Sequence, residues 1–406
     1  MIIKGGNVFL DSRFVKRDLF ISGEKIVSSS SGEVIDASGK YVVPGLVDMH
    51  VHFRDFGEEH KEDWRSGSEA ALAGGITTVF DMPNNKVPIT SKKLLDQKRD
   101  KVSSKALVDF ELYISVNNSN VDEINENKIK FVKLYYGHTT GDNKVDDAGD
   151  IFKRISKDIV IVVHAEDNRV MEENRKKFDV SEKRYHSLVR DNKAEYTAVK
   201  DLIGFAERYG NKLHITHVSC KESAEMIKNA KKRGVKVTCD TCPHYLFLDD
   251  SLYDKIGNRA KVNPALKSGE DREALWKYLN DGTIDCVCSD HAPHTLEEKN
   301  RDYENCPSGF PGVETTLPLM LTAVNEGKIK LEDFIPKMTT APAKIFGLER
   351  KGQLKEGFDA DVVIIDLNKE GAISGNKLQT KVKWSPFEGM KTQGSSVRVI
   401  ITDKVY

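Results

Sequence analysis

Two histidines separated by a single residue, His50 and His52, lie in the segment DMHVHFRDFG at residues 48–57. In an extended segment, residues i and i+2 point to the same side, so the two imidazoles can share one cation. Imidazole nitrogen is a common ligand of zinc. The spacing therefore indicates part of a metal site, whose other ligands must come from elsewhere in the chain.

Further residues able to bind a metal follow short apolar runs: His164, His217 and Asp290. A single histidine at the end of a strand is more often a structural residue held by hydrogen bonds. Five such residues at the ends of predicted strands favour a zinc site over five separate structural roles.

Lys133 ends the apolar run IKFVK, where a buried ammonium group without a partner is costly. An ion pair or a tip that reaches solvent would remove this cost. Reaction with CO2 would do so as well, because it converts the amine into an anionic carbamate that can bridge two metal ions. The position alone leaves these alternatives open.

These residues need a scaffold that brings distant segments together. The sequence pattern of residues 42–290 predicts such a scaffold. Short apolar runs alternate there with polar, helix-compatible stretches, a pattern typical of parallel βα units. Two clear helices are predicted at residues 62–75 and 221–234. The eight predicted strands are residues 42–48, 77–81, 107–114, 129–135, 159–164, 213–217, 235–239 and 284–289. Eight is the number that closes a (β/α)8 barrel, in which the carboxyl ends of the strands build the active site.

The two ends of the chain differ from the middle. Residues 1–41 and 352–406 both read as short strands punctuated by turns. We therefore expect an α/β protein in which residues 45–345 form a TIM-type barrel. Residues 1–44 and 346–406 are expected to join in one small β-sandwich domain.

The charge balance of the sequence limits which kinds of molecule the protein is expected to bind. The 62 Lys and Arg residues nearly balance the 63 Asp and Glu residues, so no field of one sign favours nucleic acid or a membrane surface. A small-molecule substrate is expected instead. The absence of a signal peptide or a long apolar run predicts a cytoplasmic protein. Six cysteines in 406 residues, including the pair Cys239 and Cys242, are interpreted as reduced thiols.

The motifs of this chain resemble those of the amidohydrolase superfamily and, within it, of the dihydroorotase family. The resemblance runs over essentially the whole chain, through VVPGLVDMHVHFRDFG, GITTVFDMPN, KLYYG, HAED, HVS, CPHYL, KVNPALKS, CSDHAPHT and GFPGVETTLPLML in family order. It implies a metal-dependent (β/α)8 barrel with a β-sandwich built from both termini, in agreement with the pattern above.

The resemblance also implies the roles of the metal-binding residues. His50, His52 and Asp290 would hold one Zn2+, His164 and His217 a second, and carboxylated Lys133 would bridge the two. Asp290 would in addition act as the general acid and base. Two other histidines are expected outside this set, namely His244 as support behind it and His138 in a solvated loop.

The reaction implied is the reversible cyclisation of N-carbamoyl-L-aspartate to L-dihydroorotate with loss of water, a step of pyrimidine (UMP) biosynthesis. The residues matching substrate-binding positions of the family are Arg54, Asn84 and His294 for the ring carboxylate, Asn263 for the pyrimidine ring, and Pro311 and Gly312 for the ureide edge. The planar guanidinium of Arg54 suits a carboxylate.

Two alternatives remain open at this point. Allantoinase, hydantoinase and dihydropyrimidinase share the metal motifs, so only the substrate-facing residues separate them from a dihydroorotase. A non-catalytic dihydroorotase-like partner of aspartate transcarbamoylase would be expected to lack metal ligands, and this chain carries all of them. The sequence leaves open whether the chain forms a homo-oligomer and whether it associates with aspartate transcarbamoylase.

Overall fold

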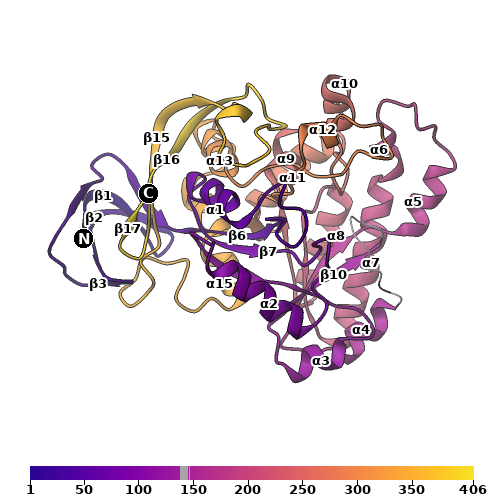
Figure 1. Ribbon diagram of the computed structural model, residues 1–406, viewed down its shortest axis with the longest axis horizontal. Helices are drawn as coiled ribbons and strands as arrows, with labels where there is room; N and C mark the ends of the chain where they lie inside the picture. Colours follow the sequence, from indigo (N-terminus) through magenta and orange to yellow (C-terminus); the bar gives the residue numbers. More distant parts are fainter. Residues whose placement is uncertain (138–144, 146) are drawn as a thin grey trace.

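The chain forms a barrel of parallel strands with a separate sheet beside it, as the computed structural model in Figure 1 shows. The structure describes residues 1–137, 145 and 147–406, so the predicted loop residue His138 lies outside the described part. The barrel lies at the right of Figure 1, and the sheet formed by the two ends of the chain lies at the left.

The described barrel has eight strands, of which the third is divided into β8 and β9. Each strand pairs in parallel with its neighbours. In chain order the strands are β6 (Leu46–Val51), β7 (Ile76–Asp81), β8 (Asp109–Leu112) with β9 (Ile114–Ser115), β10 (Phe131–Tyr136), β11 (Val160–Ala165), β12 (Lys212–Ile215), β13 (Val237–Thr241) and β14 (Cys286–Val287). A parallel bridge between Val51 and His291 closes the ring. The predicted barrel is confirmed.

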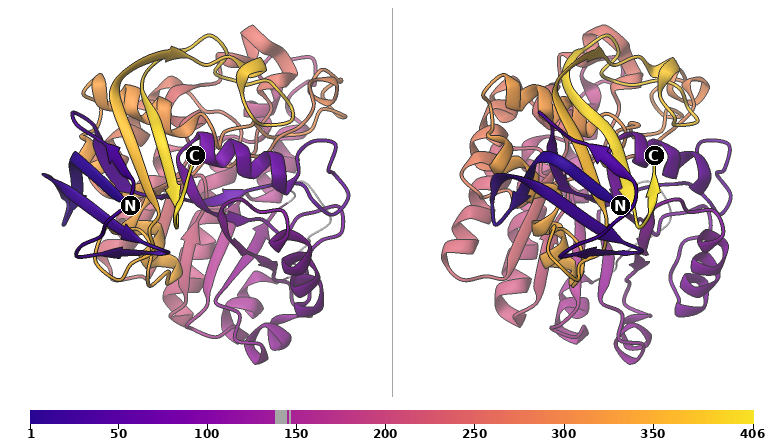
Figure 2. Two further views of the ribbon diagram at one scale, coloured as in Figure 1. Left: turned by 60° about the vertical axis from the view of Figure 1, so that its left-hand side comes forward. Right: turned by 90° about the vertical axis from the view of Figure 1, so that its left-hand side faces the viewer.

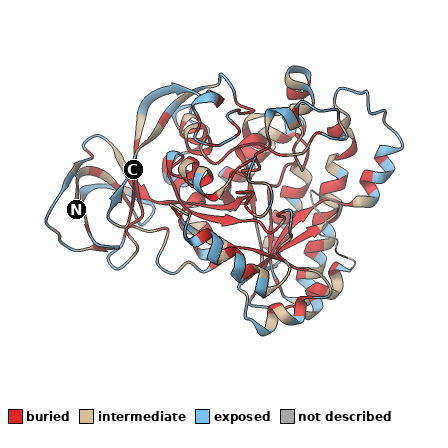
Figure 3. Cartoon of the chain, viewed as in Figure 1, coloured by how far each residue is buried: buried red, intermediate tan, exposed pale blue. Residues whose placement is uncertain are grey.

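Helices cover the outside of the barrel, and the buried residues concentrate on the strands inside it (Figure 3). The longer helices are α1 (Trp64–Ala73), α2 (Lys92–Ser103), α5 (Asn168–Arg175), α7 (Asn192–Tyr209), α8 (Lys221–Lys232), α11 (Gly269–Asn280) and α13 (Thr316–Asn325). The shorter ones are α3 (Val121–Glu126), α4 (Ala148–Arg154), α6 (Tyr185–Val189), α9 (Pro243–Phe247), α10 (Leu252–Ile256), α12 (Leu296–Lys299), α14 (Leu331–Phe334) and α15 (Thr340–Phe346), with 3-10 turns η1 (Gly257–Ala260), η2 (Ile335–Met338) and η3 (Gly375–Lys377).

Local sequence explains where these helices begin and end. Asp63 caps α1 by accepting from the backbone N–H groups of Arg65 and Ser66, and the Ser66 hydroxyl accepts in return from the Asp63 N–H. Gly75, at φ 76°, stops the chain from continuing as a helix. Both predicted helices, at residues 62–75 and 221–234, are confirmed as α1 and α8.

Strands from both ends of the chain form the second sheet. They are β1 (Ile2–Leu10), β2 (Arg13–Ser22), β3 (Lys25–Val27), β4 (Val34–Asp36), β5 (Tyr41–Pro44), β15 (Val362–Ala372), β16 (Lys391–Ile401) and β17 (Lys404–Val405). Their order is β17-β16-β15-β5-β1-β2-β3, with β4 on β1. Figure 2 shows the indigo and yellow strands side by side in both views. The expectation that both termini share one β unit is confirmed.

The predicted strand at residues 42–48 is divided, because Gly45 lies at the junction of the two sheets. A Cβ atom there would lie 2.1 Å from Oγ1 of Thr77, so the backbone can pass only as glycine. The preceding residues join the terminal sheet as β5, and the following ones enter the barrel as β6. That strand continues to Val51, so His50 lies within it and not beyond its end.

The segment between β15 and β16 reaches from the terminal sheet to the mouth of the barrel. Trp384 donates its indole N–H to the backbone carbonyl of His294 over 2.8 Å, and the Thr380 hydroxyl donates to Glu62. The carboxyl-terminal part of the chain therefore supports the loop that carries His294.

All six cysteines are free and buried, as expected for reduced thiols. Among the described residues, no helix is long and apolar enough to cross a membrane.

Candidate active site

A narrow cavity of about 40 Å³ lies at the carboxyl ends of the barrel strands. Nine of the residues predicted for the site line it: His50, His52, Arg54, Asn84, Lys133, His164, His217, Asn263 and Asp290. The structure therefore gathers the proposed metal ligands, which span 240 positions from His50 to Asp290, around one space. His294, Pro311 and Gly312 lie outside its lining.

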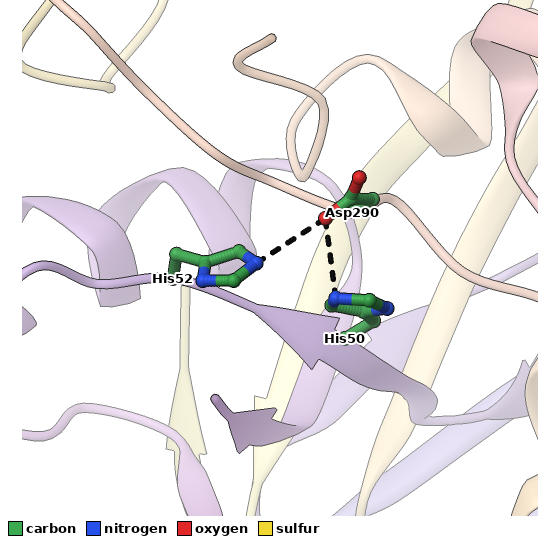
Figure 4. Close-up of side chains that lie close together, drawn as sticks. All are labelled: His50, His52 and Asp290. Carbon is green, nitrogen blue, oxygen red and sulfur yellow. Dashed lines mark ion pairs between the residues drawn. The ribbon is translucent and has the colours of Figure 1, made fainter. Parts of the chain in front are cut away.

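His50, His52 and Asp290 converge on one point (Figure 4). Nε2 of His50 lies 3.2 Å from Oδ1 of Asp290, and Nε2 of His52 lies 3.3 Å from the same oxygen. Asp290 follows the short strand β14, while the two histidines come from the end of β6. A carboxylate and two imidazoles in this arrangement are a ligand set suited to zinc.

The partner of His52 shows that the set fits a cation. Nδ1 of His52 lies 2.8 Å from Oδ1 of Asn84, an acceptor, so this nitrogen carries the proton. Nε2 is then a lone-pair acceptor that faces the carboxylate oxygen of Asp290. Two acceptors at this distance repel one another unless a proton or a metal cation lies between them, so the pair suits a bound metal ion. Asn84 thus lies against a predicted metal ligand.

His164 and His217 form a second group, at the carboxyl ends of β11 and β12. Nδ1 of His164 lies 3.1 Å from Nε2 of His217. The other nitrogen of His164, Nε2, donates to Oε2 of Glu166 over 2.9 Å, and Arg190 contacts the same carboxylate oxygen. Burial raises the pKa of Glu166, but Arg190 and His164 outweigh it and lower this pKa to about 2. Glu166 is therefore an anion that holds the ring of His164.

A second carboxylate, that of Asp240, holds the backbone of His217. Oδ1 of Asp240 accepts the backbone N–H of His217 over 2.6 Å, and Oδ2 accepts from Nε2 of His214 over 2.8 Å. Sequence reasoning did not assign Glu166, Arg190, His214 or Asp240 to the site. The acid two residues after a candidate histidine, in HAED, was the signal for Glu166, because metal-binding histidines commonly donate the N–H of their second nitrogen to a carboxylate.

Lys133 lies in β10 with 1% of its surface exposed, so its tip does not reach solvent. Nζ donates to the Thr216 hydroxyl over 3.2 Å. None of the ion pairs among the described residues involves Lys133. Burial lowers the pKa of its amine to about 8.

The histidines of the site are neutral in this environment. Burial is the main cause that lowers the pKa values of His50, His52 and His217 well below the ordinary 6.5, and the nearby Lys133 lowers all three further. A neutral imidazole is the form that binds a metal ion.

Arg54 lies at the rim of this group, with 4% of its surface exposed and a left-handed backbone at φ 61°. Nη2 lies 3.1 Å from Nε2 of His294, and Nη1 lies 3.8 Å from Glu58. Nε2 of His294 also lies 3.1 Å from the Ser308 carbonyl. Arg54 and His294 are thus in contact, although only Arg54 lines the cavity.

Asn263 also lines the cavity, and its Oδ1 lies 3.0 Å from Nε2 of His186. The backbone N–H of Gly312 donates to Nδ1 of His291 over 3.1 Å, and Pro311 has no N–H to offer. Ser308 and Gly309 line the cavity where Pro311 and Gly312 were expected.

The predicted support residue His244 is buried against Tyr245 and Phe310. It does not line the cavity, and burial lowers its pKa to about 3.

Comparison with known proteins agrees with this geometry. The model of the Amidohydrolase family matches residues 41–406. A dihydroorotase of Methanosarcina acetivorans is 37% identical over 96% of this chain and 88% of its own length, and one of Pyrococcus furiosus is 35% identical over 100% and 92%. Among solved structures, the L-hydantoinase (dihydropyrimidinase) of Arthrobacter aurescens superposes with a TM-score of 0.95 at 30% identity, over 100% of this chain and 95% of that one.

Proposed function

Since this chain belongs to the amidohydrolase family, we propose that it catalyses the dihydroorotase reaction, the reversible cyclisation of N-carbamoyl-L-aspartate to L-dihydroorotate with loss of water. This places the enzyme in pyrimidine biosynthesis, with a small molecule as its substrate. It is a hydrolase of cyclic amide bonds when the reaction runs in the opposite direction.

The observation that carries this choice of substrate is the position of Arg54. Its guanidinium is buried at the wall of the cavity, beside the three converging ligands His50, His52 and Asp290. Dihydroorotate differs from dihydropyrimidines by a ring carboxylate, which a guanidinium binds through two parallel hydrogen bonds. We propose that Arg54 binds this carboxylate, with His294 and Asn84 beside it.

The donor set supports a two-zinc site. His50, His52 and Asp290 would hold one ion, and Nδ1 of His164 and Nε2 of His217 the other. Zinc bound there supplies Lewis-acid chemistry, which polarises the reacting carbonyl group and lowers the pKa of a water molecule. Dialysis against a chelator should abolish activity, and metal analysis of the restored enzyme should give two zinc ions per chain.

Lys133 is proposed to carry a carboxyl group that bridges the two ions. Its burial and its lack of an ion pair among the described residues remove the simpler explanations for a lysine at this position. The neutral amine adds to CO2 and releases one proton, so the product is an anion. Native mass spectrometry should find the mass of one CO2 added to the active protein. The adduct should disappear in Lys133→Ala and persist in Lys130→Ala, which changes an exposed lysine.

Asp290 is proposed to move the proton. In ring opening, its carboxylate takes a proton from the attacking water and passes it to the leaving ring nitrogen. In cyclisation, the same oxygen accepts the proton of the ureido nitrogen as that nitrogen attacks the carboxyl carbon. It then returns this proton to the departing oxygen, whose C–O bond breaks and which leaves as water after taking up one further proton from solvent. Arg54 meanwhile holds the second carboxylate of N-carbamoyl-L-aspartate and fixes the ring closure in one orientation.

The similarity to the hydantoinase structure supports a second candidate, another cyclic amidohydrolase. Parallel assays of the zinc-loaded enzyme with dihydroorotate, dihydrouracil, hydantoin and allantoin test the two against each other. We expect dihydroorotate to have the highest kcat/KM. Preference for an uncharged ring would contradict the role of Arg54.

A non-catalytic role is disfavoured because every proposed metal ligand is present and converges on the cavity. Assembly into a homo-oligomer, or with aspartate transcarbamoylase, stays a prediction from the family resemblance. Light scattering of the chain alone, and of its mixture with that enzyme, would test both.

A further inference from the structure

A second and larger cavity lies at the opposite end of the barrel from the catalytic residues. It holds about 650 Å³, within the size range of about 300–1,000 Å³ typical of small-molecule sites. The amino ends of β11, β12 and β13 form one side, and the segment from α14 to α15 forms the other. We call this space the basal cavity.

Lys337 is the most unusual residue of the basal cavity. Only 8% of its surface is exposed, although it carries an ammonium group. Nζ makes one hydrogen bond, to the carbonyl of Ile284 over 2.9 Å, and none of the ion pairs within the described part of the chain includes it. Burial lowers the pKa of this amine. A buried ammonium group that uses only one of its N–H donors would be stabilised by an anion in the cavity.

The surrounding charges also favour an anion. Lys212, Lys236 and Lys344 line the cavity and are exposed to solvent. Two acids line it as well, but Asp285 is already paired with Lys231, whose Nζ lies 2.6 Å from its carboxylate. Asp333 is exposed on α14. Cationic side chains therefore outnumber the unpaired acids around the cavity.

Apart from Thr238, the rest of the wall is apolar and can hold the body of a small organic molecule. It comprises Val160, Leu213, Val235, Val237, Pro336 and Ile345. An inorganic ion would leave these side chains in contact with water, whereas an aromatic or aliphatic group would cover them. The combination of one buried cation and an apolar wall is typical of sites for small organic acids.

We propose that the basal cavity binds a small organic anion, whose carboxylate or phosphate monoester pairs with Lys337 and whose apolar body packs between the strand ends and α15. This site lies apart from the proposed catalytic centre, and its occupancy does not depend on the reaction performed there.

Isothermal titration calorimetry of the zinc-loaded protein tests the proposal with benzoate and phenyl phosphate as probes. Inorganic phosphate serves as the ion without an apolar body. We expect saturable binding of at least one organic probe and clearly weaker binding of inorganic phosphate. Comparison of the two organic probes identifies the preferred head group.

Variants locate the binding. Lys337→Met keeps the apolar part of the side chain and removes its charge. It should lower the affinity for the preferred probe about tenfold, as expected for the loss of a charge-assisted contact. Ala341→Phe places a large side chain of α15 in the cavity and should weaken binding of the preferred probe as well. The test therefore remains valid if one of the two variants does not fold. Lys232→Met, an exposed lysine outside the cavity, should bind as the wild type does.

Three results would overturn the proposal. The first is the absence of saturable binding of either organic probe. The second is wild-type affinity in both Lys337→Met and Ala341→Phe. The third is displacement of the probe by dihydroorotate in Asp290→Asn, since the probe would then occupy the catalytic cavity.

Discussion

His164 donates its Nε2 proton to Glu166 over 2.9 Å, which leaves Nδ1 as a lone pair facing His217. The carboxylate thus selects the tautomer of a histidine that we propose as a metal ligand. Arg190 keeps Glu166 ionised in a fully buried environment. The pair would act on a metal bound at this site through His164, and neither Glu166 nor Arg190 lines the cavity.

Glu166→Gln should therefore weaken the second metal site. Loss of the negative charge makes His164 a poorer donor, and such changes typically cost about 10- to 100-fold in metal affinity. Competition with a chromogenic chelator measures this affinity without reference to activity. Glu172→Gln, an exposed residue of α5, is the matched control. Equal affinities in the two variants would show that Glu166 has no part in tuning the site.

Arg190→Met should shift the pH dependence that Glu166 contributes to stability towards higher pH. In the wild type, the pKa of Glu166 is about 2 in the folded protein, below its ordinary 4.5, so its contribution is present above pH 4.5 and is lost as the pH falls towards 2. Without Arg190, only His164 and Lys267 oppose the effect of burial, so the pKa of Glu166 should rise and the loss of stability on acidification should begin at a higher pH. Urea unfolding of the metal-free variants between pH 4 and 7 measures the slope. An identical slope in both proteins would contradict this account.

Asp290→Asn should lower kcat by about 10²- to 10⁴-fold, the usual contribution of a general acid or base. The amide oxygen can still bind a metal ion, so zinc content should stay largely intact by elemental analysis. Asp96→Asn, on the exposed surface of α2, should leave kcat unchanged. A variant at Asp290 with near-normal turnover would exclude this residue from proton transfer.

Arg54→Met should raise the KM for dihydroorotate about 10- to 100-fold, the loss expected for hydrogen bonds to a charged group. Dihydrouracil lacks the carboxylate, so its slow turnover should change little. Steady-state kinetics on both substrates separate the two effects, and Arg65→Met on the exposed face of α1 provides the control. An unchanged KM for dihydroorotate would rule out carboxylate recognition by Arg54.

Trp384→Phe removes the indole N–H that holds the backbone of His294. The loss of one neutral hydrogen bond should raise the KM for dihydroorotate about 2- to 10-fold and leave kcat nearly unchanged. Trp276→Phe is a matched control, since this indole donates to the Leu246 carbonyl over 2.8 Å and does not line the cavity. It should cost similar stability without a change in KM. Equal effects of the two variants on KM would argue for general loosening of the fold.

Much of the candidate metal site was predictable because the barrel converts a pattern along the chain into a position in space. His50, His164 and His217 each follow or end an apolar run, and parallel strands bring such ends to one face. The same reasoning predicted the sheet shared by both termini. It missed the break at Gly45, because only the close approach of Thr77 makes that residue the junction between two sheets.

The residues that tune the site were harder to find, since their partners are distant in sequence. Arg190 contacts Glu166, which lies 24 residues away in the sequence, and Trp384 contacts His294, which lies 90 residues away. Nothing in the local pattern around either residue indicates its partner. The same holds for Gly312, whose N–H is donated to His291.

The sequence by itself determined the eight-stranded barrel and the set of residues whose types suit zinc, because strand periodicity and motif spacing are local properties. Only the tertiary structure decided which nitrogen of each histidine faces the cavity and which residues hold it there. It also placed the buried side chain of Lys337 at the wall of the basal cavity, at the far end of the barrel. These features depend on contacts between side chains of different strands and loops, and such contacts exist only once the chain has folded.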